Sequence, residues 1–535
     1  MSEDPQGPSL EHAAGVLVHL AVVIAIGAGV CLVVLLVMRV CGLHWSWTAP
    51  TVLAVGPVWM VDRFAALGVA FATGLVTVTG AKWHAEDLRA GGDIAALARR
   101  RRTPVSALRS GRDRRRIRAG RILTKRGLVV GRDHRGRGVH IPAGGHGGRH
   151  TLVLGATGSG KTVTQAWIAG RLIQLGHGAV VVDPKGDRML RDELHRSARR
   201  ARREFREWTP EGPDAYNPFA HGSDSELADK ALAGESYTEP HYLRQAQRYL
   251  GHATRTLRAA GRPVTLATLT EAMSPRRLEA IGRGLDGERQ AQELQDYLDD
   301  LTAEQQRGLA GTRDRLAILA ESDVAPWLAP HDAGGPSIDL LRSIQAREVV
   351  YFRLDADRRP LLSTMLAAAI VQDLLTVAAN HQHRPIPTLV LVDEFSAVAP
   401  DGIARLFGRG RSAGMSLLLG TQELADLTLV DHPNLKDQVL GNVTTLIAHR
   451  QVIPDSAEQI AAIAGTRGTW VHTQRTDHRL NGQGSDGDTG TRTRGREFAV
   501  HPDEIKQLQT GWAVVACPGR TQPRITRMLH PEDAR

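Results

Sequence analysis

Cysteine is scarce in this chain of 535 residues. The three cysteines, Cys31, Cys41 and Cys517, lie far apart and form no Cys-x-x-Cys pair. Disulfide frameworks and structural zinc sites both need closely spaced cysteines, so the sequence supports neither. We interpret the three cysteines as packing residues. The length exceeds that of one ordinary core and predicts at least two folded units.

Lysine and arginine are absent from the start of the chain, which carries Glu3, Asp4 and Glu11 before a long apolar run. A cleaved signal peptide needs a basic segment there and a shorter apolar run. Residues 13–38 contain only His19 as a polar side chain and span about 39 Å as a helix, enough to cross a bilayer. We therefore expect a retained transmembrane helix at residues 13–38.

A second apolar run extends from Val52 to Thr79, but it contains Asp62 and Arg63. Charges are costly at the bilayer centre and tolerated at its interface. We therefore place a second transmembrane helix at residues 58–80, with the two charges near one end. Residues 1–80 then form an N-terminal membrane anchor.

Positive charge is concentrated directly after this anchor. Residues 81–150 carry 19 Lys or Arg against five Asp or Glu, a net charge of +14, whereas the whole chain carries +10. The positive-inside rule places this segment in the cytoplasm, and two spans bring both termini to that side. We expect a basic juxtamembrane linker at residues 81–125. For the arginines between Arg99 and Arg118 we favour contact with anionic lipid, and DNA contact is the alternative.

A glycine-rich loop stands between an apolar strand and a helix-like segment within residues 151–175. Glycine lacks a Cβ, so the loop can turn sharply and point successive amides at an anion. The loop fits the pattern Gly-x-x-x-x-Gly-Lys-[Ser/Thr], in which the lysine reaches the β and γ phosphates and the following hydroxyl ligates Mg²⁺. We predict that ATP and Mg²⁺ are bound by Gly155, Ala156, Thr157, Gly158, Ser159, Gly160, Lys161, Thr162, Val163 and Asp393.

Two adjacent acids follow the buried strand predicted at Thr388–Val392. Carboxyl ends of parallel strands line the ligand crevice of a doubly wound sheet, so both acids should lie beside the phosphate loop. We predict that Asp393 and Thr162 hold Mg²⁺ and that Glu394 activates the attacking water as general base. Such a base favours ATP hydrolysis over phosphorylation of a metabolite.

A further glycine and arginine-rich stretch, residues 408–414, precedes a strand predicted at Ser416–Gly420. Gln422 follows that strand, where it would sense the γ phosphate or orient water. Arg411 would act on the triphosphate of a neighbouring subunit, because a guanidinium stabilises charge spread over phosphoryl oxygens. The alternative for an exposed arginine is a solvated side chain. With Lys161 and Glu394, these two residues form our predicted catalytic set.

Strands alternate with helices through most of the remaining chain, which predicts an α/β fold with a mostly parallel sheet covered on both faces. We assign residues 126–222 and 344–520 to this domain and 521–535 to a short C-terminal tail. Residues 223–343 are rich in Ala, Leu, Arg, Glu and Gln and predict an all-α insertion. Residues 475–496 lack apolar periodicity and predict a mobile loop.

The ordered motifs resemble the type IV coupling proteins of bacterial conjugation, of the TraD/TraG type, which are related to the FtsK/HerA group of DNA-translocating ATPases. The two predicted spans and the helical insertion fit this resemblance, which covers nearly the whole chain. The motifs that carry it are residues 157–162, Asp183-Pro184-Lys185-Gly186, Asn217-Pro218-Phe219, Val392-Asp393-Glu394-Phe395 and residues 410–414 through Gln422.

The resemblance implies a RecA-like P-loop ATPase anchored in the bacterial plasma membrane. It implies a homo-hexameric ring that binds relaxase-bound DNA and feeds it to a type IV secretion channel. It also matches Arg411 to the arginine finger and Gln422 to the glutamine motif. The sequence departs from the family in having no long acidic tail for relaxosome docking after Ala516. We therefore expect the helical insertion to recognise the substrate.

Two other functions remain open at this point. One is an FtsK/SpoIIIE-like translocase of double-stranded DNA, although no winged-helix module follows the sheet. The other is a membrane receptor that docks secretion substrates and uses ATP only to hold its ring together. An ABC transporter is disfavoured because the sequence contains no Leu-Ser-Gly-Gly-Gln stretch. The strandedness of the DNA is not specified by any of these residues.

Overall fold

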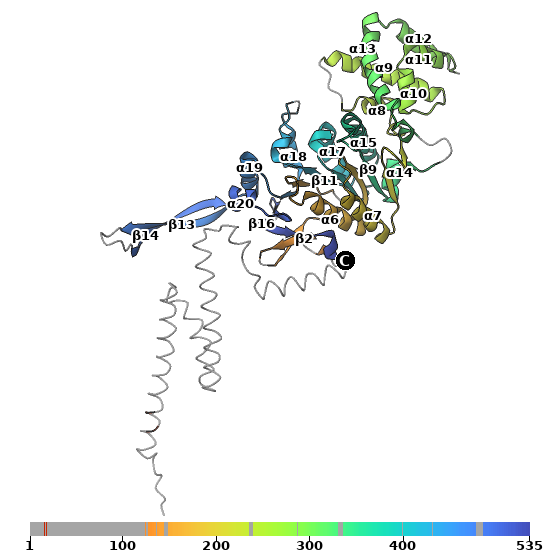
Figure 1. Ribbon diagram of the computed structural model, residues 1–535. Coiled ribbons are helices and arrows are strands. Elements are labelled where there is room, and N and C mark those ends of the chain that lie inside the picture. Colours follow the sequence, from red (N-terminus) through yellow and green to blue (C-terminus); the bar gives the residue numbers. More distant parts are fainter. Residues whose placement is uncertain are drawn as a thin grey trace, which may run out of the picture. The chain divides into compact units, whose positions relative to one another are not determined.

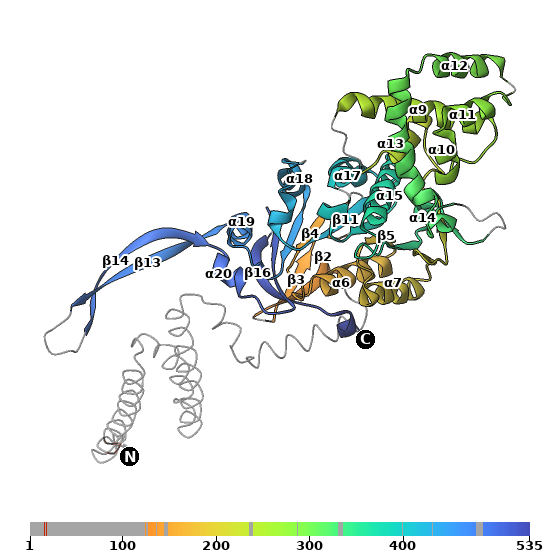
Figure 2. The same cartoon turned by 45° about the horizontal axis from the view of Figure 1, so that its top comes forward.

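The computed structural model describes residues 123–534 except 125–126, 135, 144–147, 235–238, 286, 330–334, 399, 431, 478–484 and 520, together with Gly15 and Val18 (Figures 1 and 2). The transmembrane helices expected at 13–38 and 58–80 lie outside the described residues apart from these two positions, as does nearly all of the linker expected at 81–125. Both therefore stay predictions. The chain divides into two compact units at residue 100, and everything below concerns the second.

A mixed twelve-stranded sheet forms the centre of the described unit, in the order β1-β2-β16-β15-β12-β4-β11-β10-β5-β9-β6, with β3 beside β2. Seven neighbouring strands from β12 to β6 pair in parallel. The inner strands of this parallel part are almost entirely buried, because helices cover both faces. The seven parallel strands are β4 (Thr151–Leu154), β5 (Gly178–Asp183), β6 (Phe205–Trp208), β9 (Val349–Arg353), β10 (Thr388–Val392), β11 (Met415–Thr421) and β12 (Thr445–Ala448).

The other part of the sheet is antiparallel. It contains β1 (Leu123–Thr124), β2 (Gly127–Asp133), β3 (Gly138–Ile141), β15 (Trp512–Cys517) and β16 (Thr521–Met528). The short tail expected at 521–535 is wrong for its first half, because β16 pairs with both β15 and β2. This strand has a weak apolar pattern, because it carries Arg524 and Arg527 and most of its residues are exposed or only partly buried.

Alternate residues of the parallel strands pack against different helices. Val181 and Leu391 face the cluster formed with α6 (Lys161–Gln174) and α7 (Arg188–Arg200). Val182 and Val392 face the opposite cluster, formed with α15 (Pro360–Asn380) and α17 (Pro400–Ser412). This alternation gives the doubly covered α/β fold that the sequence predicts. Shorter elements complete the unit: α14 (Leu340–Ala346), α16 (Phe395–Val398), η3 (Leu424–Leu427), α18 (Leu435–Asn442), α19 (Pro454–Ala464), α20 (Pro502–Lys506) and η4 (Pro531–Ala534).

Helix α15 is long and apolar enough to cross a membrane, and it is the one such helix among the described residues. Its 18-residue apolar window is 89% buried inside the protein. The helix packs against α17 and against α8 of the insertion, and its apolar residues belong to the core cluster of the sheet, so its apolar composition reflects core packing.

A helical insertion separates β7 (Ala215–Tyr216) from its parallel partner β8 (Ser337–Ile338). Figures 1 and 2 show it as a group of helices at one end of the unit, joined to the sheet through α8 beside α15. The sequence predicts an all-α insertion over residues 223–343, but strand β8 lies within that range. Its helices are α8 (Asp224–Ala231), α9 (Pro240–Ala259), α10 (Leu266–Ala272), α11 (Pro275–Gly282), α12 (Glu288–Asp299), α13 (Ala303–Ala320) and η2 (Ala325–Leu328).

The mobile loop predicted at residues 475–496 is wrong. Strands β13 (Thr466–Asp477) and β14 (Ser485–Phe498) instead form a long antiparallel hairpin, which extends from the unit in Figures 1 and 2. The two strands pair only with each other, as a sheet separate from the central one. Such a hairpin does not require the alternation of apolar and polar residues by which a strand is usually predicted. Its threonines still favour extended backbone, and the paired strands satisfy each other's amides.

Candidate nucleotide-binding site

The loop from Gly155 to Gly160 joins β4 to the first turn of α6. Gly158 and Gly160 have φ values of +76° and +107°, a region that favours glycine. The Ser159 amide donates to the Ala156 carbonyl at 3.0 Å and closes the turn. Gly160 is the N-cap of α6, so the positive end of the helix dipole points into the loop. This is the arrangement that binds a phosphate.

Neighbouring segments hold the loop in place through its backbone. The Gly155 amide donates to the Gln422 carbonyl at 3.0 Å, after β11, and the Ala156 amide donates to the Arg450 carbonyl at 3.2 Å, after β12. From the other side, the Gly511 amide donates to the Ser159 carbonyl at 2.9 Å. The loop is therefore fixed by three segments that are distant in sequence.

Lys161 is nearly buried and lies between the two acids at the end of β10. Its Nζ is 3.0 Å from Asp393 Oδ1 and 2.7 Å from Glu394 Oε1. Gln165, one turn further along α6, donates its Nε2 to Asp393 Oδ1 at 3.0 Å. The structure thus brings together the phosphate loop and the acid pair, as their positions at strand ends predict.

Glu394 has a φ of +46°, in the left-handed region that non-glycine residues seldom occupy. Strained backbone of this kind costs on the order of 1–3 kcal/mol and persists where the surrounding structure fixes it. The carboxylate also accepts a hydrogen bond from Lys185 Nζ at 2.9 Å, so two lysines hold the same oxygen. The strained backbone aims the carboxylate at the phosphate loop.

Lys185 comes from the turn that follows β5. Burial disfavours its charge, but the Glu394 carboxylate outweighs this and raises the pKa of Lys185. The turn is fixed by Asp183, which accepts hydrogen bonds from the amides of Gly186 and Asp187 and from the Tyr351 hydroxyl. Burial raises the pKa of Asp183, partly offset by these donors. The turn therefore belongs to the site and is more than a solvated connection.

Gln422 follows β11 and lies against the loop, with Oε1 3.5 Å from Thr157 Oγ1. Arg411 lies elsewhere, at the amino ends of the strands, where its carbonyl accepts a hydrogen bond from the Gly148 amide. Strand β4, which is about 13 Å long, lies between Gly148 and the phosphate loop. Arg411 is exposed at that edge. Among the described residues, Arg411 thus takes no part in the contacts of the phosphate loop, and its role toward a neighbouring subunit stays a prediction.

Sequence reasoning did not single out His449. Its Nε2 lies 2.9 Å from Thr164 Oγ1 on α6, and its Nδ1 lies 3.0 Å from the Trp512 carbonyl. Complete burial lowers its pKa to about 4, and the nearby Lys161 charge acts in the same direction. A neutral histidine thus braces the first turn of α6. The sequence feature that points to His449 is its place directly after β12, at the carboxyl end of a strand next to β4.

The residues present fit a nucleoside triphosphate with Mg²⁺. Ser159 Oγ is buried and has no hydrogen-bond partner among the described residues, as expected of a group that donates to phosphate. Thr162, the second residue of α6, is partly exposed beside it. Within the described part of the chain no three His, Cys, Asp or Glu residues cluster. Mg²⁺ takes few protein ligands and keeps phosphates and water, so Thr162 and Asp393 would suffice to hold it.

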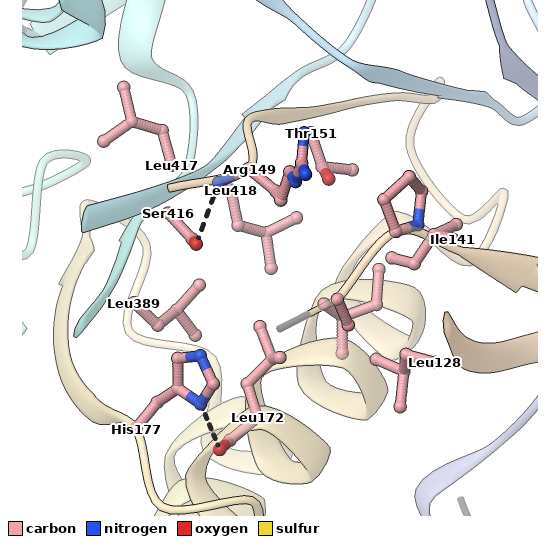
Figure 3. Close-up of a pocket in the computed structure, with 13 residues that line it drawn as sticks. Leu128, Ile141, Arg149, Thr151, Leu172, His177, Leu389, Ser416, Leu417 and Leu418 are labelled. Carbon is pink, nitrogen blue, oxygen red and sulfur yellow. Dashed lines mark hydrogen bonds between the residues drawn. The ribbon is translucent and has the colours of Figure 1, made fainter. Parts of the chain in front are cut away.

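A small cavity lies near the amino-terminal ends of the central strands, away from the phosphate loop. Figure 3 shows it between Thr151, Leu389 and Leu418 on the strands and His177 after α6. Its volume of about 20 Å³ holds about one water molecule. Because it lies at the amino ends of β4, β10 and β11, it is distinct from the phosphate site and too small for a nucleotide.

Comparison with known proteins agrees with this geometry. Residues 146–309 match a family described as the central domain of helicase HerA, which includes the phosphate loop. Residues 387–510 match a family described as the TraM recognition site of TraD and TraG. A curated protein of Mycoplasma pneumoniae, itself uncharacterized, is 31% identical over 90 residues. The match covers 17% of this chain and 60% of that relative's length.

Solved structures share the fold. The bacterial conjugative coupling protein TrwBdeltaN70 is 18% identical with a TM-score of 0.57, covering 77% of this chain and 90% of its own. TrwB with ADP and Mg²⁺ has a TM-score of 0.56 at 18% identity, covering 77% and 91%. VirB4 of Thermoanaerobacter pseudethanolicus is 15% identical with a TM-score of 0.50, covering 77% and 99%. The chain therefore has a RecA-like P-loop ATPase fold.

Within that class, both matched families and the shared fold support one assignment. The chain resembles the type IV coupling proteins of the TraD/TraG type.

Proposed function

We propose that this protein is a membrane-anchored ATPase that translocates DNA and couples relaxase-bound conjugative DNA to a type IV secretion channel. The observation that carries the proposal is the cluster in which Lys161 and Lys185 both contact the Glu394 carboxylate at the end of β10. A general base beside a phosphate loop is suited to hydrolysis. The TraD/TraG family match supports a coupling role for that hydrolysis.

Each residue of the site has a distinct part in the proposed reaction. The loop amides and the start of α6 bind the triphosphate, and Lys161 neutralises its β and γ phosphates. Thr162 and Asp393 hold Mg²⁺, which when bound supplies charge neutralisation at the phosphates. Glu394 takes a proton from the attacking water, and Gln422 lies beside the loop to orient it. Arg411 acts on the triphosphate of the next subunit in a hexameric ring.

The two predicted spans at 13–38 and 58–80 anchor the motor in the bacterial plasma membrane with both termini cytoplasmic. DNA is bound through its phosphates without sequence preference, which suits a motor that must move along any sequence. Relaxase and channel proteins are the proposed protein partners, in line with the TraM recognition site named in the matched family.

Replacing Glu394 by Gln tests the ATPase directly. The amide keeps the shape of the side chain but removes the base, so hydrolysis should fall by about 10²–10⁴-fold while ATP binding remains. Steady-state hydrolysis and equilibrium nucleotide binding, both measured on the full-length protein in detergent, distinguish a loss of catalysis from a loss of ATP binding. Unchanged hydrolysis would contradict the role of Glu394 as base. Conjugative transfer that survives loss of hydrolysis would favour the docking-receptor function.

The match to the HerA domain favours one second candidate, a translocase of double-stranded DNA. Stimulation of ATP hydrolysis by single-stranded or duplex DNA distinguishes it from the coupling function. Stimulation by duplex DNA alone, without any effect of single strands, would favour the second candidate.

A further inference from the structure

Gln165 is a buried polar residue of α6 that contacts Asp393. It stands four residues after Lys161, so the two side chains lie on the same face of the helix. Gln165 is completely buried. A primary amide has a donor end and an acceptor end, and a buried amide needs a partner for each of them. The two ends of the Gln165 amide are therefore considered separately.

The nitrogen end of the amide holds the Asp393 carboxylate. Gln165 Nε2 donates a hydrogen bond to Asp393 Oδ1 at 3.0 Å, and Lys161 Nζ lies 3.0 Å from the same oxygen. Two donors on one oxygen fix the orientation of the carboxylate. Among the described residues, no side chain donates to the other oxygen, Oδ2. The carboxylate is thus held by one oxygen, and the second is left for a metal ion or its water ligands.

The oxygen end of the amide lacks a donor. Gln165 Oε1 is buried and accepts no hydrogen bond among the described residues. Turning the amide over would not relieve this, because Oε1 would then face the Asp393 carboxylate and two acceptors would meet. A buried acceptor beside this carboxylate needs a donor that arrives with the ligand. Water bound to Mg²⁺ is such a donor, since Mg²⁺ usually keeps several waters.

The backbone of β11 accommodates this amide and carboxylate closely. Residue 420 is glycine, and a Cβ there would collide with both Gln165 Nε2 and Asp393 Oδ1. The two groups therefore pack directly on the strand backbone, in a space that any larger residue would fill. Such confinement leaves the Gln165 amide little freedom to turn away from Asp393.

We propose that Gln165 is a positioning residue of the Mg²⁺ site, which holds Asp393 through its nitrogen and accepts a hydrogen bond from a metal-bound water through its oxygen. The inference rests on the proposed function, in which Asp393 is a Mg²⁺ ligand. In the same reaction Lys161 serves the phosphates of ATP, so Gln165 is the donor that stays on Asp393. The phosphate-loop motif itself does not include this position.

Replacing Gln165 by Met tests the proposal, because the thioether side chain has nearly the length of the original one but carries no amide. Gln174→Met is the control. Gln174 lies on the same helix, and its Nε2 donates to Ser197 Oγ on α7, away from the site. The affinity of full-length protein in detergent for a fluorescent, non-hydrolysable ATP analogue is measured in EDTA and across a titration with Mg²⁺.

Loss of a partner that orients a metal ligand typically lowers metal affinity by about 10–100-fold. The Gln165→Met protein should therefore need about 10–100-fold more free Mg²⁺ than the wild type to reach half of the Mg²⁺ effect on analogue affinity. Its affinity in EDTA should be unchanged, and the control should follow the wild type in both conditions. Gln165→Asn should share the Mg²⁺ defect, because its amide is one methylene too short to reach Asp393.

Wild-type Mg²⁺ dependence in both Gln165 variants would overturn the proposal. An equal loss of analogue affinity in EDTA and in Mg²⁺ would also overturn it, because Gln165 would then support the phosphate loop in general and not the metal. The EDTA measurement reports in the same titration that each variant is folded.

The titration also separates this inference from the proposed function. If the wild type binds the analogue with Mg²⁺ and hydrolyses ATP, and both Gln165 variants show its Mg²⁺ dependence, the inference fails while the ATPase stands. If the wild type binds no analogue in either condition, the nucleotide site fails and the inference fails with it.

Discussion

Lys161, Lys185 and Glu394 form the closest group of charges in the site, with one carboxylate oxygen shared by two lysines. The sequence predicted Lys161 and Glu394 because each stands at a fixed place in a motif. Lys185 was named only as part of a motif, since a lysine in a turn is usually solvated. Its contact depends on the pairing of β5 with β10, which brings two chain segments together. No local pattern encodes that pairing.

Replacing Lys185 by Ala should lower the turnover of ATP by about tenfold, since the loss of a charge-assisted hydrogen bond to Glu394 leaves the carboxylate less firmly placed. The KM for ATP should change little, because Lys185 contacts the base and not the loop. Lys506→Ala is the control, as Lys506 is a partly exposed lysine of α20 that pairs with Asp503. Equal turnover in the Lys185 variant and the control would contradict a positioning role.

A substitution at Gly420 tests how closely β11 packs against Asp393, the proposed Mg²⁺ ligand. A Cβ at this position in β11 would collide with Asp393 Oδ1 and Gln165 Nε2. Gly420→Ala should therefore displace Asp393, reduce Mg²⁺-dependent hydrolysis at least tenfold and destabilise the fold by about 1–3 kcal/mol.

Gly441 in α18 is the matched control, because an added Cβ there meets no atom within 4 Å. Gly441→Ala should leave hydrolysis unchanged and stabilise its helix by about 0.5–1 kcal/mol. Wild-type hydrolysis in the Gly420 variant would show that Asp393 tolerates movement.

Elements with a buried apolar run were the predictable part of the fold. The strands expected at 388–392 and 416–420 match β10 and β11 to within one residue at each end, because burial on both faces leaves a continuous apolar signal. Strand β16 and the hairpin of β13 and β14 were missed for the opposite reason. Most residues of β16 are exposed or only partly buried. Pairing of backbone amides, rather than an apolar pattern, defines both elements.

The insertion is tied to the sheet domain by a buried ionic contact between α8 and α15. Lys230 Nζ lies 2.6 Å from Asp373 Oδ1, and the Tyr216 hydroxyl donates to Asp373 Oδ2 at 2.9 Å. Burial raises the pKa of Asp373, and the Lys230 charge opposes that shift. Since both charges are removed from water, each depends on the other.

Replacing Lys230 by Met should therefore destabilise the protein by about 3–5 kcal/mol, because an uncompensated carboxylate stays buried. The double variant Lys230→Met and Asp373→Leu should recover most of this loss. Denaturant unfolding of the wild type, Lys230→Met, Asp373→Leu and the double variant measures the coupling. A double variant as unstable as the sum of the single ones would contradict a direct interaction.

At the scale of the whole molecule, the two ends of the parallel strands carry different parts of the proposed ATPase site. The phosphate loop, both acids and Gln422 lie at the carboxyl ends of the strands, whereas Arg411 lies at the amino ends. A site shared between subunits then requires that the amino ends of the strands in one subunit face the carboxyl ends in the next. The sequence predicted the components of this arrangement, and the assembly itself stays a proposal.

Two buried histidines predict how stability depends on pH. Burial lowers the pKa values of His150 and His449 to about 4, from 6.5 in the unfolded chain. The unfolded state therefore binds protons first as the pH falls below 6.5, and the stability that the neutral histidines confer is lost progressively toward pH 4. At pH 5 the loss is about 2 kcal/mol for each histidine.

Thermal unfolding at pH 7 and pH 5 checks this prediction. The wild-type midpoint should be lower at pH 5, and His150→Gln should show a smaller difference between the two values. Gln preserves the bonds to the Leu417 amide and the Phe407 carbonyl but does not titrate. Asp183, whose raised pKa acts in the opposite direction, is common to both proteins. An equal difference in wild type and variant would contradict the role of His150.

Conjugative transfer in a strain carrying Lys161→Ala is the most direct test of the central claim, that ATP turnover at this loop drives DNA export. Lys506→Ala is the control, and membrane fractionation confirms that each protein is present and localised. The structure predicts loss of transfer in the Lys161 variant alone, because its Nζ is the loop cation beside both acids. Normal transfer by a correctly localised Lys161→Ala protein would contradict the claim.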